Sequence, residues 1–284
     1  MLKLINSNDK FFVAGATGMA GSAICRKLKQ YGYGDSSKNG KILTPNRKEL
    51  NLLNYSEVSS WFKINKPTIT VLAAAKVGGI MANSLEPADF ILENLKIQTN
   101  VIEASFLHGV RRFLFLGSSC IYPKYAKQPI KEEELLNGYL EATNESYAIA
   151  KIAGLKLCQA LRDQYNFDCI SLMPTNLYGP GDNYNPKSSH VLAALIHKFH
   201  IATELSSPTV NCLGTGSPFR EFLYADDLGE AVVFALENWN PSFPNAPLDK
   251  NNKPLLFLNV GTGVDISIHE LAHKIASIYS YKGD

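Results

Sequence analysis

Residues 11–21 read Phe-Phe-Val-Ala-Gly-Ala-Thr-Gly-Met-Ala-Gly, a short apolar run that meets glycines at Gly15, Gly18 and Gly21. Residues 22–30 then carry apolar side chains at helical spacing, so the segment is predicted to be a strand, a tight turn and a helix. Glycines in such a turn let a pyrophosphate approach the helix N-terminus, where free N–H groups and the helix dipole favour anions. In this context the pattern predicts a dinucleotide site rather than a turn whose glycines serve packing alone.

The alternation of strand and helix continues along the chain. Further strands are predicted at residues 41–43, 68–75, 112–117 and 169–173, and further helices at residues 89–108 and 144–165. This order predicts an α/β fold with a doubly wound, Rossmann-like parallel sheet covered by helices on both faces.

The regular alternation stops at a predicted turn, residues 174–180. We expect residues 1–180 to form the dinucleotide-binding domain. Residues 181–284 are expected to form mainly a smaller substrate-binding lobe over the carboxyl edge of the sheet, with some segments returning to the sheet. Ser267 and Glu270 form a capping-box pattern that opens a final amphipathic helix reaching about Tyr281.

Composition limits the classes of function. The 284 residues include 28 Lys and Arg against 26 Asp and Glu, so the net charge of +2 implies no general attraction for nucleic acid or membranes. No apolar run approaches the ~20 residues that span a bilayer, and the polar N-terminus leads straight into the first strand, which favours the cytoplasm. The five cysteines form no CxxC motif or metal-like cluster, so we expect reduced thiols and no metal. Four of them are interpreted as buried fillers, and Cys120 is treated separately.

The end of the second strand indicates which dinucleotide binds. An acidic residue there usually holds a free ribose 2′-hydroxyl, whereas a 2′-phosphate needs cations. This chain has Thr44-Pro-Asn-Arg47-Lys48 at that place, without an acid. Arg47 offers a planar, fork-shaped phosphate donor, so NADP(H) is favoured over NAD(H). The alternative is that Arg47 is only a solvated surface residue.

A phenol and an ammonium lie one helical turn apart in Tyr147-Ala-Ile-Ala-Lys151. Residues at this spacing share a helix face, and Lys151 is expected to lower the pKa of Tyr147 so that the phenol can exchange protons near neutrality. Such a pair alone is common on surfaces. Ser118, at the mouth of the fourth strand, changes the interpretation, because glycine turn, strand-end serine and YxxxK is the order found in short-chain dehydrogenases.

The sequence resembles GDP-L-fucose synthases, which belong to the extended short-chain dehydrogenase/reductases, over nearly all of residues 11–283. The runs that carry the resemblance are AAAKVGGI (73–80), FLGSSCIYP (115–123), ESYAIAKIAG (145–154), MPTNLYGP (173–180) and NVGTGV (259–264).

The resemblance implies conversion of GDP-4-dehydro-6-deoxy-D-mannose to GDP-L-fucose by 3,5-epimerisation and NADPH-dependent 4-reduction. It implies a reductase triad of Ser118, Tyr147 and Lys151 and an epimerisation pair of Cys120 and His190. The implied cofactor contacts are Gly15, Ala16, Thr17, Gly18, Met19, Ala20, Gly21, Arg47, Ala73, Ala74, Leu116, Gly117, Ser118, Ser119, Lys151, Pro174, Thr175, Asn176, Leu177 and His190. The implied substrate contacts are Lys198, Leu213 and Arg220. A homodimer through the helices at residues 89–108 and 144–165 is also implied.

Three positions depart from the family pattern. Thr17 stands where an arginine commonly holds the 2′-phosphate, and Leu213 stands where a tryptophan is usual near the nucleotide. Members also continue by a few tens of residues beyond the position of Asp284, so we expect the chain to be truncated at its C-terminus.

Two other functions stay open at the level of the sequence. One is another nucleotide-sugar enzyme of the same fold, a 4-epimerase or a dehydratase, although dehydratases carry an acidic pair where this chain has Ser118-Ser-Cys120. The other is a regulator that binds the dinucleotide without turnover, although such a protein needs no proton relay of Ser118, Tyr147 and Lys151.

Overall fold

The computed structural model describes residues 3–283, so Met1, Leu2 and the chain end at Asp284 lie outside the described residues. Its centre is a six-stranded sheet in which every neighbouring pair of strands is parallel. The strands run in the order β2 (Lys41–Leu43), β1 (Lys10–Ala14), β3 (Ile69–Leu72), β4 (Arg112–Leu116), β5 (Cys169–Pro174) and β8 (Phe257–Val260). The predicted doubly wound fold is confirmed. The order reverses direction between β1 and β3, which is where such sheets bind ligands.

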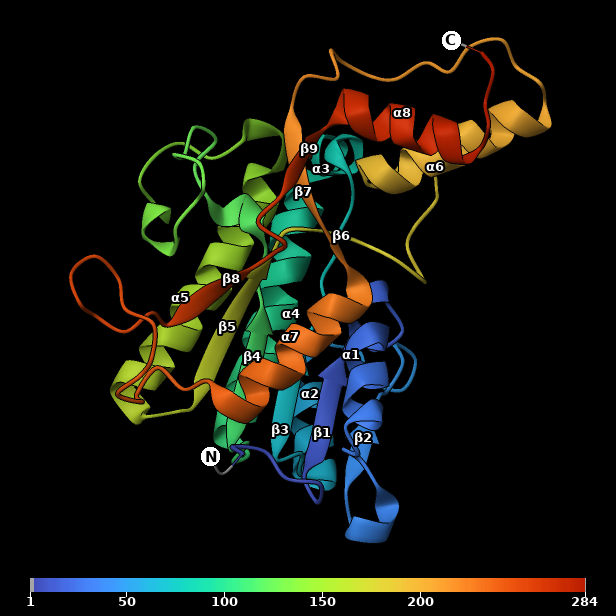
Figure 1. Ribbon diagram of the computed structural model, residues 1–284. Coiled ribbons are helices and arrows are strands. Elements are labelled where there is room, and N and C mark those ends of the chain that lie inside the picture. The colour runs from blue at the N-terminus through green and yellow to red at the C-terminus, as the bar shows by residue number, and fades with distance from the viewer. Residues whose placement is uncertain (1–2, 284) are drawn as a thin grey trace.

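Helices cover both faces of this sheet (Figure 1). One face carries α1 (Met19–Gln30) and α7 (Ala225–Asn238), and the other carries α2 (Tyr55–Asn65), α4 (Pro87–Leu107) and α5 (Glu145–Tyr165). Side chains alternate along β1, so Phe11 and Val13 enter the core under α1 and α7, while Phe12 enters the core under α2, α4 and α5. Apolar burial on both faces explains why β1 is apolar at every position after Lys10.

A smaller lobe lies beyond the carboxyl ends of the strands (Figure 1). It contains the sheet β6 (Asn176–Tyr178), β7 (Phe219–Tyr224) and β9 (Asp265–Ser267), with the helices α3 (Ile80–Leu85), α6 (Val191–Glu204) and α8 (Ile268–Ile278) nearby. Leu195 and Phe199 of α6 pack with Leu271 and Ile275 of α8. The capping box that begins α8 is confirmed. Short 3-10 turns occupy Ser36–Lys38, Ser119–Ile121, Glu132–Glu134 and Ala142–Asn144.

The structure corrects two expectations about particular segments. The segment 174–180 was expected to be a turn, but it contains β6, which pairs with β7 through Leu177 and Leu223. Backbone pairing across the sequence thus overrides a stretch that carries two prolines and a glycine. Cys212 was expected to be buried, but it is exposed in the segment between α6 and β7, whereas Cys25, Cys158 and Cys169 are buried as expected.

Segments from the C-terminal part of the chain also contribute to the main sheet. The strand β8 adds to its edge beside β5, and α7 packs along α1. No helix within residues 3–283 is long and apolar enough to cross a membrane.

Candidate active site

The glycine turn between β1 and α1 has the shape that a dinucleotide requires. Gly15 has φ +84°, and a Cβ atom there would lie 2.7 Å from the backbone nitrogen of Ala74. A Cβ at Gly21 would clash with the carbonyl oxygen of Gly15, so the helix starts in close contact with the turn. Gly18 is the N-cap residue of α1, and no side chain caps the first N–H groups of the helix. The first N–H groups of the helix therefore face an open approach suited to a pyrophosphate.

Gly18 and Gly21 should respond differently to substitution by alanine. At Gly18 a Cβ would meet only the Gly15 oxygen, at 3.5 Å, and φ is −81°, so Gly18→Ala should leave the free energy of unfolding within about 0.5 kcal/mol. Gly21→Ala should lower it by about 1–3 kcal/mol because rigid backbone atoms would have to move. Urea unfolding of both variants measures this difference. Equal stabilities would show that the turn does not pack as tightly as described.

The carboxyl ends of the neighbouring strands form the rest of the cofactor wall. Ala73 continues from β3 and donates its N–H to Ala14, while Gly117 continues from β4 and donates to Leu172. Thr175 follows β5, and its buried hydroxyl has no hydrogen-bond partner in the described part of the chain. A buried hydroxyl without a partner is costly unless a ligand meets it. The remaining predicted cofactor residues lie at the same strand ends: Leu116 and Pro174 end β4 and β5, Ala74 and Ser119 follow β3 and β4, and Asn176 and Leu177 lie in β6.

Four side chains with proton chemistry gather where β4 ends. Ser118 caps the 3-10 turn that follows β4, and its Oγ accepts a 3.4 Å hydrogen bond from the backbone N–H of Cys120. The Ser118 hydroxyl also lies close enough to the side chains of Tyr147 and Cys120 to lower the pKa of both. Lys151, one turn along α5 from Tyr147, donates from Nζ to the Leu116 carbonyl at 2.8 Å. The structure thus brings the predicted triad and Cys120 into one cluster.

Burial controls the protonation states in this cluster. Burial raises the pKa of Tyr147 well above its usual value, Cys120 raises it further, and the Ser118 hydrogen bond lowers it. The expectation of a lowered Tyr147 pKa is therefore wrong for this structure, because burial has the largest effect and raises the pKa. Burial also raises the pKa of the Cys120 thiol to about 11, although Ser118 and Lys151 oppose it. At neutral pH both groups hold their protons.

Lys151 is a buried cation, and its desolvation lowers the free energy of unfolding of the protein. Burial lowers its pKa from 10.5 to about 8, against a smaller upward effect of Cys120. In the unfolded chain the ammonium persists to its ordinary pKa, so between pH 8 and 10.5 the unfolded state binds more protons and stability rises with pH. Below pH 8 the full penalty, roughly 3 kcal/mol for such a shift, is present.

Lys151→Met should therefore be more stable than the unmodified protein at pH 7. About 1–2 kcal/mol should remain after the loss of the hydrogen bond to Leu116. This gain should shrink as the pH rises from 8 toward 10.5. Urea unfolding at pH 7 and pH 9.5 measures it, with Lys156→Met as the control at an exposed position of the same helix. If Lys151→Met is less stable than Lys156→Met at pH 7, the conclusion that burial of the Lys151 ammonium lowers stability is wrong.

His190 lies on a different segment from the cluster, at the N-cap of α6. The preceding loop touches the turn after β3, where Gly79 donates its N–H to Ser188 at 3.0 Å. His190 keeps contact with solvent, yet partial desolvation of its ring lowers its pKa, and the Asp182 carboxylate acts in the opposite direction. The lowered pKa favours the neutral imidazole at pH 7. Within residues 3–283 no hydrogen bond joins His190 to Cys120.

The predicted substrate contacts lie on the smaller lobe. Lys198 on α6 donates from Nζ to the Asn211 carbonyl at 2.6 Å, which places it beside the segment that carries the exposed Leu213. Arg220 is the second residue of β7 and is exposed, and one of its guanidinium nitrogens donates to the Phe219 carbonyl at 2.6 Å. Both cations keep most of their donors available to a ligand.

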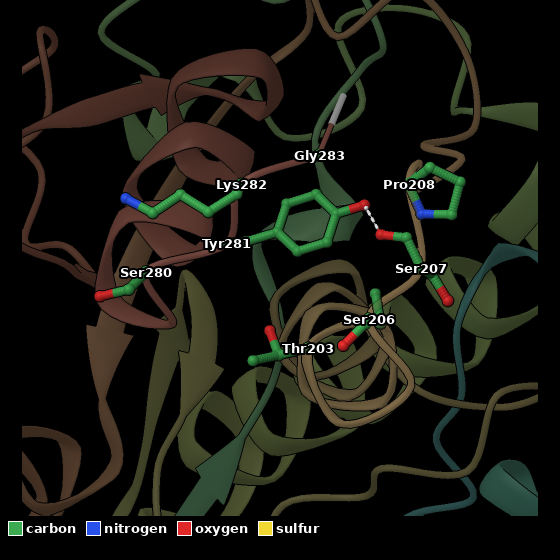
Figure 2. Close-up of a pocket in the computed structure, with 9 residues that line it drawn as sticks. Thr203, Ser206, Ser207, Pro208, Ser280, Tyr281, Lys282 and Gly283 are labelled. Carbon is green, nitrogen blue, oxygen red and sulfur yellow. Dashed lines mark hydrogen bonds between the residues drawn. The ribbon is translucent and has the colours of Figure 1, made fainter.

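A hollow of about 460 Å³ lies elsewhere on this lobe. Figure 2 shows it between the C-terminal end of α6 and the segment after α8, where Tyr281 donates its hydroxyl hydrogen bond to the Ser207 carbonyl at 2.8 Å. None of the residues predicted to act in catalysis or in binding lines it. Within residues 3–283 no group of three or more His, Cys, Asp or Glu side chains is arranged to hold a metal.

Sequence reasoning missed two cations near the glycine turn. Arg26 and Lys29 line a second hollow of about 280 Å³ together with Thr17 and Thr44. Arg47, which was predicted to serve there, is exposed in the loop after β2 and does not line this hollow. Ser22, Arg26 and Lys29 follow one another at i, i+4 and i+7 on α1, and this spacing was the signal available in the sequence.

Geometry and comparison agree on the class of protein. The chain belongs to the NAD dependent epimerase/dehydratase family, whose pattern matches residues 11–245. More closely, it is 49% identical to the GDP-L-fucose synthase of Escherichia coli K12 over 278 residues, which are 98% of this chain and 83% of that protein. It is also 49% identical to GDP-L-fucose synthase 1 of Arabidopsis thaliana over 278 residues, 98% of this chain and 80% of that protein.

A solved structure supports the same grouping. The GDP-L-fucose synthetase of Naegleria fowleri bound to NADP superposes with a TM-score of 0.81 at 27% identity, covering 99% of this chain and 80% of that one. Together with the shape of the glycine turn, these relatives indicate NADP(H) as the cofactor. The predicted fold family and cofactor are thus confirmed.

Proposed function

We propose that this protein converts GDP-4-dehydro-6-deoxy-D-mannose to GDP-L-fucose by inverting C3 and C5 and then reducing the C4 ketone. The observation that carries the proposal is the cluster at the end of β4, where Ser118 lies beside both Tyr147 and Cys120. Two hydroxyl groups and a thiol thus surround one place where a ketone oxygen can bind. The similarity to GDP-L-fucose synthases supports the choice of substrate.

The reduction depends on Tyr147 and its neighbours. Bound NADPH supplies a hydride to C4, and the oxygen of that carbon then needs a proton. Tyr147 holds its proton at neutral pH, which is the state required of a donor. Lys151, with Nζ 5.8 Å from the centre of the Tyr147 ring, stabilises the phenolate that remains. Ser118 orients the ketone oxygen by a hydrogen bond.

The two inversions use the same polarised ketone. Hydrogen bonds from Ser118 and Tyr147 to the C4 oxygen withdraw charge and acidify the C–H bonds at C3 and C5. Each inversion removes a proton from one face of the carbon and returns a proton to the other face. Cys120 and His190 begin in complementary states, a protonated thiol and a neutral imidazole, so one can donate while the other accepts. After each inversion, proton exchange with water restores both groups.

Lys198 and Arg220 are proposed to hold the diphosphate of the substrate, because both cations keep donors available on the lobe that faces the sheet edge. Leu213 offers the base an aliphatic contact. We also propose a cytoplasmic homodimer. Exposed apolar side chains on the two long helices that pack together, Leu92 on α4 and Ile149 on α5, support pairing through that surface.

The site also weighs against the alternatives. A dehydratase of this fold needs acidic groups beside the catalytic hydroxyl, and Ser119 and Cys120 occupy those positions here. A regulator that only bound dinucleotide would need no proton relay, whereas Ser118, Tyr147 and Lys151 lie together in this site.

Incubation with GDP-4-dehydro-6-deoxy-D-mannose and NADPH, followed by NMR of the sugar product, tests the function. GDP-L-fucose is expected. A product reduced at C4 without inversion would identify a simple reductase. Products formed without consumption of NADPH would identify an epimerase or a dehydratase. The matched incubation with the UDP-linked 4-keto-6-deoxyglucose should give no turnover above background.

A further inference from the structure

The hollow beside the glycine turn lies where the 2′ position of a bound adenosine ribose is expected. Its wall joins Thr17 from the glycine turn to Thr44, the first residue after β2. In doubly wound sheets the group at the end of the second strand contacts that ribose. The side chains that line this hollow include no carboxylate. The hollow therefore accepts an anion better than a free 2′-hydroxyl.

The positive charge in this hollow comes from the exposed side of α1. Arg26 and Lys29 both line it, and both act electrostatically on the Cys25 thiol in the same wall, lowering its pKa against the larger upward effect of burial. Two cations beside one hollow that no acidic side chain lines create a positive potential there, which favours an anionic ligand.

The two cations are not equally available. Arg26 is already paired with Asp226 of α7, its Nε lying 3.0 Å from a carboxylate oxygen, and it also donates to Ser22. Lys29 is exposed and forms no ion pair with any residue between 3 and 283. Thr17 is short and neutral, so the turn itself brings no charge. Lys29 is the cation that a phosphate can engage without breaking an existing ion pair.

We propose that Lys29 determines the preference of this protein for NADPH over NADH by binding the 2′-phosphate, with the hydroxyls of Thr17, Ser22 and Thr44 as additional donors. The proposal rests on the assignment of NADP(H) as the cofactor. It gives Lys29 the role that the sequence suggested for Arg47. Lys29 contacts the part of the cofactor farthest from the chemistry, so it should influence affinity and not the proton steps.

Equilibrium titration of NADPH and NADH against the unmodified protein and four variants tests the proposal. Lys29→Gln should weaken NADPH binding by about tenfold or more, as expected for loss of a charged hydrogen bond. The affinity for NADH should stay within about twofold of that of the unmodified protein. Lys29→Arg should keep most of the NADPH affinity. Lys48→Gln, which removes an equally exposed cation from the loop after β2, should change neither affinity by more than about twofold. The loss caused by Lys29→Gln should shrink at high salt.

Each outcome of this experiment is decisive. If Lys29→Gln binds NADPH within about twofold of the unmodified protein while Arg47→Gln loses the affinity, the proposal is overturned and Arg47 holds the phosphate. If the unmodified protein binds NADH as well as NADPH, the cofactor assignment fails and the proposal fails with it. Lys29 is exposed at the surface of α1, so its variants should fold, and unchanged unfolding curves confirm that affinity alone is measured.

Discussion

Tyr147→Phe is expected to reduce the rate of ketone reduction by about 10²–10⁴-fold, the range that a lost general acid produces. The substitution removes one hydroxyl from a ring that packs edge-on against Phe90, with ring centres 6.4 Å apart, so the packing should survive. Cofactor affinity should stay within about threefold because the phenol acts on the substrate oxygen. Single-turnover oxidation of bound NADPH by the keto sugar measures the rate.

Tyr139→Phe is the control for this experiment, since the Tyr139 side chain is 92% exposed and has no proposed role. Its rate should equal that of the unmodified protein. Retention of most of the turnover by Tyr147→Phe would show that another group donates the proton. Ser118 would then be the next candidate, because its hydroxyl belongs to the same cluster as Tyr147.

Cys120→Ser is expected to slow exchange of the C3 and C5 hydrogens of the keto sugar with heavy water by about 100-fold or more. Serine keeps nearly the same shape and can keep the hydrogen bond to Ser118, but its hydroxyl is a far weaker acid than a thiol. The exchange is followed by NMR in the presence of NADP⁺, which allows no reduction. Cofactor affinity should be unchanged.

Cys212→Ser is the matched control, because Cys212 is an exposed thiol outside the cluster. It should exchange both hydrogens at the unmodified rate. If Cys120→Ser does so too, Cys120 is only a partly buried thiol and the epimerisation belongs to other groups. His190→Asn then becomes the informative variant, since His190 is the second member of the proposed pair.

The sequence was sufficient for the parts of this molecule that depend on local pattern. The glycine turn was recognisable because Gly15 needs a positive φ and Gly21 permits close packing, and both requirements are local. Ser118, Tyr147 and Lys151 were recognisable because parallel strands end at one edge of the sheet, which brings a strand-end serine to the face of the following helix.

Features that depend on distant contacts escaped sequence reasoning. Arg26 is less available to a ligand than Lys29 because it pairs with Asp226, which lies 200 residues away in the sequence. The strand β6 forms only because β7 supplies a partner for a proline-bounded stretch. The pKa of Tyr147 was predicted in the wrong direction because its burial depends on surrounding elements, which spacing within α5 does not reveal.

The measurement that tests the central claim most directly is one complete reaction in heavy water with NADPH and GDP-4-dehydro-6-deoxy-D-mannose, followed by NMR of the product. If one ketone-binding cluster serves both inversions and the reduction, the product is GDP-L-fucose with deuterium at C3 and C5 and protium at C4. A product that keeps protium at C3 and C5 would contradict the claim, because the cluster at Ser118, Cys120 and Tyr147 would then perform reduction alone.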